Sequence, residues 1–187
     1  MVSRALPDQW ERDILNFWFE ELSPKDWFVQ DIAVDLALTS RFYDLFEHVS
    51  TALPQMCETS AKAALAAIIV LDQFPRNMFR NQAKAFDTDD KALELAQGTI
   101  SRGLDKKLPI EQRQFIYMPF MHSEEPFVQA RSIKLFTALA SASNLKFAIA
   151  HKDIIDRFGR FPHRNEMLGR VSSSEEILFL KQPGSSF

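Results

Sequence analysis

The sequence has few of the residues that crosslink a chain, bend it sharply or cradle a phosphate group. Cys57 is the only cysteine among 187 residues, so neither an intrachain disulfide nor a cysteine-rich zinc module can form. The five glycines form no glycine-rich phosphate loop. A reducing cytoplasm is therefore the expected location.

Long apolar runs and an excess of positive charge are also missing. The longest apolar run, Ala63 to Leu71, falls well short of the roughly 20 residues that a membrane-spanning helix needs. The first residues, Met1 to Asp8, lack the apolar stretch of a secretion signal. Lysine and arginine total 22 against 25 acidic residues, so no overall basic field attracts nucleic acid. We expect neither a membrane nor a nucleic acid as a partner.

The sequence is rich in apolar residues at helical spacing. Hydrophobic residues make up 46% of the chain, and 17 phenylalanines against two tyrosines are typical of a well-filled core. Trp10, Ile14 and Trp18 share one face of a first predicted helix, which ends at Ser23-Pro24. Further helices are predicted over residues 31–51, 60–71, 85–103, 109–119, 127–142 and 144–158, and after the capping-box sequence of residues 173–176.

Two prolines are expected to interrupt this helical pattern. Pro75 prevents straightforward continuation of the third helix, and Pro119 ends or kinks the helix that it follows. Sustained two-residue alternation is missing, so no sheet is expected. The prediction is a single all-α domain over residues 1–187, with about eight or nine helices in an antiparallel bundle or a stack of hairpins and a loosely held tail at about 182–187.

Polar residues gather in three segments beside helix ends, namely 71–80, 117–125 and 151–165. The third segment is dense in arginine, and guanidinium groups suit planar carboxylates or phosphates because they donate paired hydrogen bonds. Asn77 and Asn165 could fix the orientation of a bound group. An equally open alternative is that the arginines satisfy carbonyls at helix ends and tie loops together.

His151 projects from the apolar stripe of its helix, near Phe147, Ile154 and Ile155. A core-facing imidazole is either hydrogen-bonded for structural reasons or used as a ligand or base, and both readings stay open. No two histidines stand four residues apart and no His-Glu-x-x-His sequence occurs, so no metal or other cofactor is predicted. No nucleophile motif occurs either, and whether the chain is an enzyme stays open.

Three motifs carry a resemblance to a known family. They are residues 71–77, residues 117–124, and residues 157–165 together with Leu168-Gly169-Arg170 and Glu175-Glu176. The set resembles the bacterial domain-of-unknown-function 924 family over most of the chain. The resemblance implies a fold similar to tetratricopeptide-repeat proteins, with a concave face and no established activity. It also marks the signature positions Asp72, Arg76, Asn77, His122, Glu124, His151, Arg157, Arg160, His163, Arg164 and Asn165.

Two functional hypotheses follow, beside the possibility that the motifs are wholly structural. In the first, the three polar segments meet at a pocket for a small anionic metabolite that carries phosphate or carboxylate. Its ligand-binding residues would be Asp72, Arg76, Asn77, Arg157, Arg160, His163, Arg164 and Asn165. His122 or His151, steered by Glu124 or Asp72, would serve as acid or base. In the second, the protein is a helical-repeat adaptor that binds a protein or peptide on its concave face.

Overall fold

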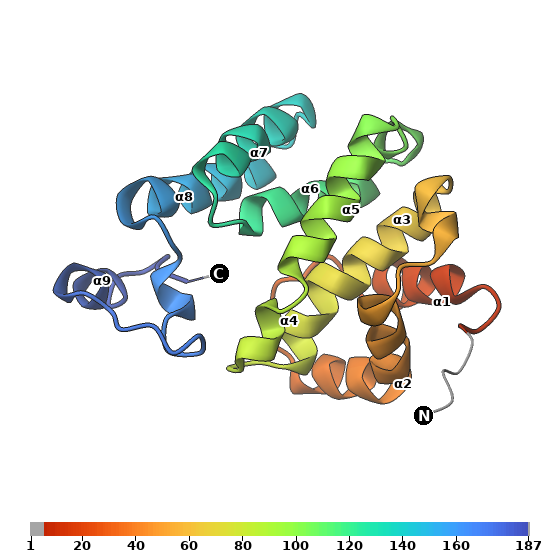
Figure 1. The fold of residues 1–187 in the computed structure, drawn as a ribbon, viewed down its shortest axis with the longest axis horizontal. Coiled ribbons are helices and arrows are strands. Elements are labelled where there is room, and N and C mark those ends of the chain that lie inside the picture. The colour runs from red at the N-terminus through yellow and green to blue at the C-terminus, as the bar shows by residue number, and fades with distance from the viewer. Residues whose placement is uncertain (1–5, 187) are drawn as a thin grey trace. The chain divides into compact units, whose positions relative to one another are not determined.

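The computed structural model describes residues 6–186, and every regular element within that range is a helix (Figure 1). This confirms the all-α prediction. The described chain divides into two compact units, the first made of residues 6–80 and 84–119 and the second of residues 81–83 and 120–186. The expectation of one domain stays a prediction. No helix within residues 6–186 has the length and apolar composition to cross a membrane.

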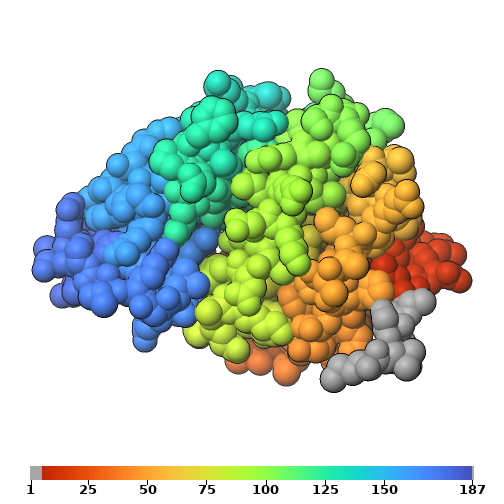
Figure 2. Space-filling view, in the orientation of Figure 1, coloured from red at the N-terminus to blue at the C-terminus, as the bar shows by residue number. Residues whose placement is uncertain are grey.

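The regular elements described in the first unit are all helices, and two of its helical stretches contain a π-helical turn. Its helices are α1 (Trp10–Asn16) with the π-helical turn η1 (Phe17–Glu21), α2 (Ile32–Thr51), α3 (Ala61–Ile68) with the π-helical turn η3 (Ile69–Gln73), α4 (Phe74–Met78), α5 (Asp89–Ser101) and α6 (Ile110–His122) as far as Pro119. Short 3-10 turns span Gln55–Glu58, Ala83–Phe86 and Asp105–Lys107. Side chains from α2, α4 and α5 form the face of this unit that Figure 2 turns toward the viewer.

Helix α3 forms the core of the first unit. The whole apolar run from Ala63 to Leu71 is 0% exposed, because α1 and α5 pack against it. Trp18 completes this core between two phenylalanine rings, with ring centroids 5.8 Å from Phe74 and 5.8 Å from Phe115. Full burial of one such side chain contributes about 1.5–3 kcal/mol to folding. The longest apolar run of the sequence is therefore a core helix.

The third predicted helix does not stop before Pro75. Instead α3, η3 and α4 follow one another without a break from Ala61 to Met78. The π-helical turn shifts backbone pairing by one residue just before the proline, which then stands in the first turn of α4, where a missing N–H costs little. Likewise Pro119 lies inside α6, which continues to His122.

The second unit contains a helical hairpin, α7 (Pro126–Ala138) against α8 (Ala142–Phe158), followed by the 3-10 turn η6 (Pro162–Arg164) and α9 (Ser174–Phe179). Helix α7 ends before the predicted boundary at residue 142, because the chain reverses at Ala140, whose φ is 57°. Gly159, with φ 68°, closes α8 in the left-handed conformation that suits glycine. Behind it, Ile154, Ile155 and Phe161 form a small core.

The predicted capping box at the start of α9 is present. The Ser173 hydroxyl accepts a hydrogen bond from the Glu176 N–H at 3.2 Å, and a Glu176 carboxylate oxygen accepts one from the Ser173 N–H at 2.7 Å. Two backbone donors that the helix cannot satisfy are thereby paired.

Replacing Ser173 with alanine should lower the free energy of unfolding by about 1 kcal/mol, because the Glu176 N–H loses its acceptor. Urea denaturation of the purified protein measures the change. Ser174→Ala is the matched control, since Ser174 is the first residue of the helix and is exposed. Equal losses in the two variants would contradict a capping role for Ser173.

Candidate functional site

The second and third polar segments meet in the second unit, and Glu124 joins them. One carboxylate oxygen of Glu124 accepts the backbone N–H of Phe161 at 2.8 Å. The two oxygens also accept from the two terminal nitrogens of Arg170, at 2.6 and 2.9 Å. In addition, a terminal nitrogen of Arg164 donates to the His122 carbonyl at 2.9 Å. The chain after α6 is thereby fastened to the turn that follows α8.

His151 lies at the centre of this meeting point and is only 4% exposed. Its Nδ1 is 2.8 Å from the Phe147 carbonyl oxygen, which can only accept. This hydrogen bond assigns the proton to Nδ1 and makes Nε2 the acceptor of the neutral ring. The ring centroid of His151 lies 6.0 Å from that of His122 and 5.6 Å from that of Phe161.

The Phe161 ring brings the remaining groups into the same cluster. Its centroid is 5.6 Å from the ring centroid of His163, and the Arg164 guanidinium lies 4.6 Å above it. Arg164 is a buried side chain, whereas His122 and His163 are half-buried. Two imidazoles and one guanidinium therefore lie against the Phe161 ring, and the third imidazole, that of His122, lies beside His151. We call His122, His151, His163 and Arg164 the imidazole cluster.

Electrostatics in the imidazole cluster keep its central ring neutral. Burial lowers the pKa of His151 to about 3, and electrostatic interactions with His122, Arg164 and His163 act in the same direction. Burial alone would raise the pKa of Glu124. The hydrogen bonds from Arg170 and the Phe161 N–H outweigh burial and hold that pKa below its ordinary value. At neutral pH the site therefore combines an ionised carboxylate with an uncharged central imidazole.

Two arginines of the third segment are engaged by glutamates of α9. Both carboxylate oxygens of Glu176 accept from Arg160, at 2.7 and 2.8 Å, and Arg160 also donates to the Val171 carbonyl at 2.9 Å. The hydrogen bonds that Glu176 accepts from Arg160 lower the pKa of Glu176 to about 2. Arg157 pairs with Glu175 at 2.7 Å. Both arginines thus join the end of α8 to α9, as the structural reading of the motif expects.

Asn165 is buried in the same region. Its side-chain amide nitrogen donates to the Ser172 hydroxyl at 3.0 Å, so the residue holds the loop that leads into α9. This hydrogen bond satisfies a buried amide group of Asn165 and so stabilises the loop.

The first polar segment forms its own network in the first unit. Arg76 donates to both carboxylate oxygens of Asp89, at 2.9 and 3.0 Å, and to the backbone carbonyl of the fully buried Asp72. Asn77 donates to a carboxylate oxygen of Asp35 at 2.8 Å, and Arg80 pairs with the same carboxylate. These contacts link α4 to α2 and α5. The expectation that this segment shares a site with the other two stays a prediction.

Sequence reasoning missed two buried polar residues on α7. Gln129 and Ser132 are both 0% exposed. The Gln129 amide nitrogen donates to the carbonyls of Met121 and Ser123, at 2.7 and 2.6 Å, and so caps the end of α6. The signal was available, because Gln129 and Ser132 stand at helical spacing with the buried Phe136 on one face.

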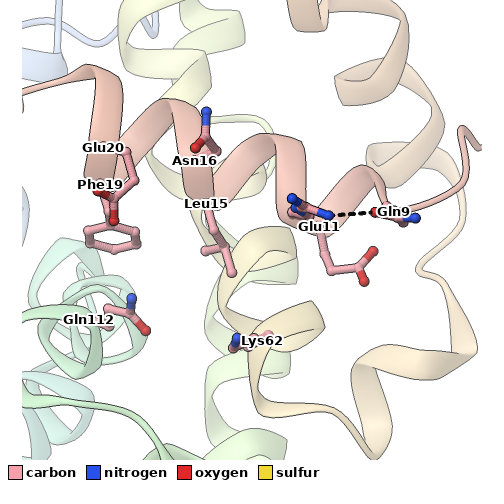
Figure 3. Close-up of a pocket in the computed structure, with 9 residues that line it drawn as sticks. Gln9, Glu11, Leu15, Asn16, Phe19, Glu20, Lys62 and Gln112 are labelled. Atoms are coloured by element: carbon pink, nitrogen blue, oxygen red, sulfur yellow. Dashed lines mark hydrogen bonds between the residues drawn. The ribbon is translucent and has the colours of Figure 1, made fainter.

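The first unit also carries a groove of about 520 Å³, drawn in Figure 3. Leu15 and Phe19 line it from α1 and η1, and Lys62 and Gln112 line it from α3 and α6. No predicted site residue borders it. Within residues 6–186, no group of three or more His, Cys, Asp or Glu side chains is arranged to hold a metal ion.

The fold and these contacts define an all-α protein whose polar motifs fasten helix ends together. Residues 14–184 match the family model of a bacterial protein of unknown function, DUF924, and the chain belongs to this family. The resemblance found in the three motifs is thereby confirmed. A solved structure, the protein of unknown function ATU0120 from Agrobacterium tumefaciens, is 37% identical, covers 91% of this chain and 96% of its own, and superposes with a TM-score of 0.87. No curated protein matches.

His151 should make the protein less stable as the pH falls through the range in which an unfolded histidine takes up a proton. The unfolded ring titrates near pH 6.5 and the folded ring near pH 3, so the unfolded state binds more protons between these values. The stabilisation is complete above pH 6.5 and is lost as the pH falls. From pH 7.5 to 5.5 the loss should be about 1.4 kcal/mol.

Urea denaturation at several pH values measures this slope. His151→Gln should flatten the slope, whereas His48→Gln, a change on α2 in the first unit, should leave it unchanged. An unaltered slope in His151→Gln would show that His151 does not titrate in this way.

Proposed function

We propose that the second unit binds a small anion, a metabolite that carries phosphate or carboxylate, at the imidazole cluster. The observation that carries the proposal is the packing of His151, His163 and the Arg164 guanidinium against Phe161, with the His122 ring centroid 6.0 Å from that of His151. The Arg164 guanidinium donates charge-assisted hydrogen bonds of the kind that phosphate and carboxylate oxygens accept, and imidazole N–H groups of His122 and His163 can add further donors. His122 and His163 are half-buried and offer access from solvent.

The proposal locates the ligand at the cluster and away from Arg157 and Arg160. Glu175 and Glu176 balance the charges of these two arginines, so an incoming anion would have to displace a carboxylate already in place. Arg76 is held in the same way by Asp89. Such displacement costs affinity, because the released carboxylates would lose their charge-assisted hydrogen bonds.

A proton-transfer role, if the ligand is also a substrate, falls to His122. The pKa of about 3 makes His151 a weak base at neutral pH, whereas efficient general bases titrate near the working pH. His151 would then act as a fixed neighbour, since its hydrogen bond to the Phe147 carbonyl sets its orientation and tautomer.

Thermal unfolding in the presence of inorganic phosphate, acetate and adenosine monophosphate tests this site. At least one of the three should raise Tm, and a concentration 100 times Kd corresponds to about 2.7 kcal/mol of stabilisation. His163→Gln should weaken that ligand at least about fivefold, whereas His48→Gln should not. Absence of any Tm shift with all three compounds, or a full shift retained in His163→Gln, would reject the site.

A second candidate function, an adaptor that binds a protein partner, is favoured by an exposed apolar strip at the start of α2. Phe28, Val29, Ile32 and Leu36 are 62%, 60%, 77% and 65% exposed, and Ile32 and Leu36 stand one turn apart on the helix. Apolar side chains gathered on a surface in this way are typical of sites that a partner covers.

Affinity capture from a bacterial lysate tests the strip. The unaltered protein should recover a partner in equimolar amount, and Ile32→Glu with Leu36→Glu should lose it without a change in Tm, because both side chains are exposed. Leu53→Glu, at another exposed leucine, is the control and should retain the partner. Recovery of the same proteins by every variant would argue against the strip.

A further inference from the structure

Three aromatic rings of the first unit lie within cation–π distance of the ammonium group of Lys84. Its Nζ is 4.4 Å from the ring centroid of Phe79, 5.4 Å from that of Tyr43 and 5.8 Å from that of Phe46. A ring face attracts a cation within roughly 6 Å of its centroid. The hydrogen bond to Glu47 raises the pKa of Lys84, so the three rings share a full positive charge at neutral pH.

The three rings stand at angles to one another, as the walls of a cage do. The Phe79 ring meets the Tyr43 ring at 74° and the Phe46 ring at 56°, with centroids 6.3 and 5.5 Å apart. A carboxylate oxygen of Glu47 lies 2.9 Å from the Lys84 Nζ. Phe46 and Phe79 are buried, whereas Tyr43 and Glu47 are exposed, so solvent reaches the site on their side. We call Tyr43, Phe46, Glu47 and Phe79 the aromatic cage.

Local structure explains why these side chains meet. Tyr43, Phe46 and Glu47 stand three and four residues apart on α2 and therefore lie on one face of that helix. Helix α2 packs against α4, and Phe79 is the residue at which α4 ends. Lys84 reaches the cage from the 3-10 turn that follows. All of these residues belong to the first unit.

The chemistry of the cage suits a quaternary ammonium group better than a lysine. A primary ammonium is strongly hydrated and loses hydrogen bonds to water where aromatic rings cover it. A quaternary ammonium has no N–H, so its alkyl groups pack on ring faces without that loss. Aromatic cages are accordingly the sites that recognise choline-type cations. Here three rings supply the apolar contact and Glu47 supplies the opposite charge.

The contacts that hold Lys84 in the cage are weak enough to be exchanged. Its ammonium makes an ion pair with Glu47 and a 3.4 Å hydrogen bond to the Tyr43 hydroxyl. The two side chains of the ion pair are 39% and 47% exposed, and ion pairs of this kind contribute little to stability. Arg160, by contrast, donates two hydrogen bonds to the carboxylate of Glu176. The long flexible stem of Lys84 lets its ammonium move into solvent.

We propose that the aromatic cage binds a small molecule that carries a trimethylammonium group, and that Lys84 occupies the cage until such a ligand displaces it. The quaternary nitrogen takes the position of the Lys84 Nζ between the three rings, and Glu47 balances its charge. Lys84 is thus an internal competitor of the ligand. None of these residues belongs to the imidazole cluster, so this site and the anion site stand or fall independently.

A proton NMR titration with choline tests the proposal. The N-methyl resonance of choline should move upfield in the presence of the unaltered protein, because ring currents shield protons that lie over aromatic faces. The neutral carbon isostere of choline, in which a tert-butyl group replaces the trimethylammonium group, should bind about fivefold more weakly. An internal competitor that fills the cage about 90% of the time lowers the apparent affinity about tenfold, so Lys84→Ala should bind choline about tenfold more tightly.

Two further variants complete the experiment. Tyr43→Leu, which removes an exposed wall of the cage, should weaken choline about fivefold in the Lys84→Ala background. Lys91→Ala is the matched control, since Lys91 is an exposed lysine that also reaches α2, through the carbonyl of Ser50. It should bind choline as the unaltered protein does.

Four results would each overturn the proposal. They are no shift of the choline resonance with the unaltered protein, equal binding of choline and its neutral isostere, no loss of affinity in Tyr43→Leu, and a gain of affinity in Lys91→Ala as large as that in Lys84→Ala.

Discussion

The carboxylate of Glu124 is the contact on which the second unit depends. It joins a residue just after α6 to the backbone of Phe161 and to the side chain of Arg170, 37 and 46 residues further along the chain. Phe161 in turn carries His151, His163 and Arg164 around its ring. Without this carboxylate, a buried backbone donor and a guanidinium would lose their acceptor, and the turn that arranges the imidazole cluster would lose its main tie.

Paired carboxylates and guanidiniums recur at several helix ends. Asp89 holds Arg76, Glu176 holds Arg160 and Glu124 holds Arg170, each through two hydrogen bonds. Such bidentate pairs fix orientation as well as distance, so they suit the fastening of helices that meet at an angle. The arginine-rich motifs are therefore accounted for largely by structure. This fastening of helix ends accounts for most arginines of the family signature but not for its histidines.

Much of the fold could be predicted from local sequence, because local rules govern it. Helix α2 ends at Thr51 as predicted, and the capping box at Ser173 and Glu176 follows from four consecutive residues. The passage of a helix through Pro75 could not be predicted, since the π-helical turn that permits it depends on the tertiary packing of Asp72 and Gln73 into the core. Buried apolar residues alone do not distinguish an α-helical turn from a π-helical one.

The candidate site was predictable in its residues more than in its contacts. Segments 117–125 and 151–165 do meet, yet the pairing of Arg160 with Glu176 and of Glu124 with Arg170 depends on the tertiary course of the chain. The groove had no sequence signal at all, because its walls come from α1, α3 and α6, and each contributes only ordinary surface residues. Spacing along one helix reveals a row of side chains but not the wall that faces it.

A double-mutant cycle on Glu124 and Arg170 tests the central claim most directly. The free energy of unfolding is measured for the unaltered protein, for Glu124→Gln, for Arg170→Gln and for the double variant. If the carboxylate fastens the two segments, the single changes will not add, and the coupling energy will be about 2 kcal/mol in favour of the native pair. Strict additivity, with a coupling energy near zero, would contradict the account.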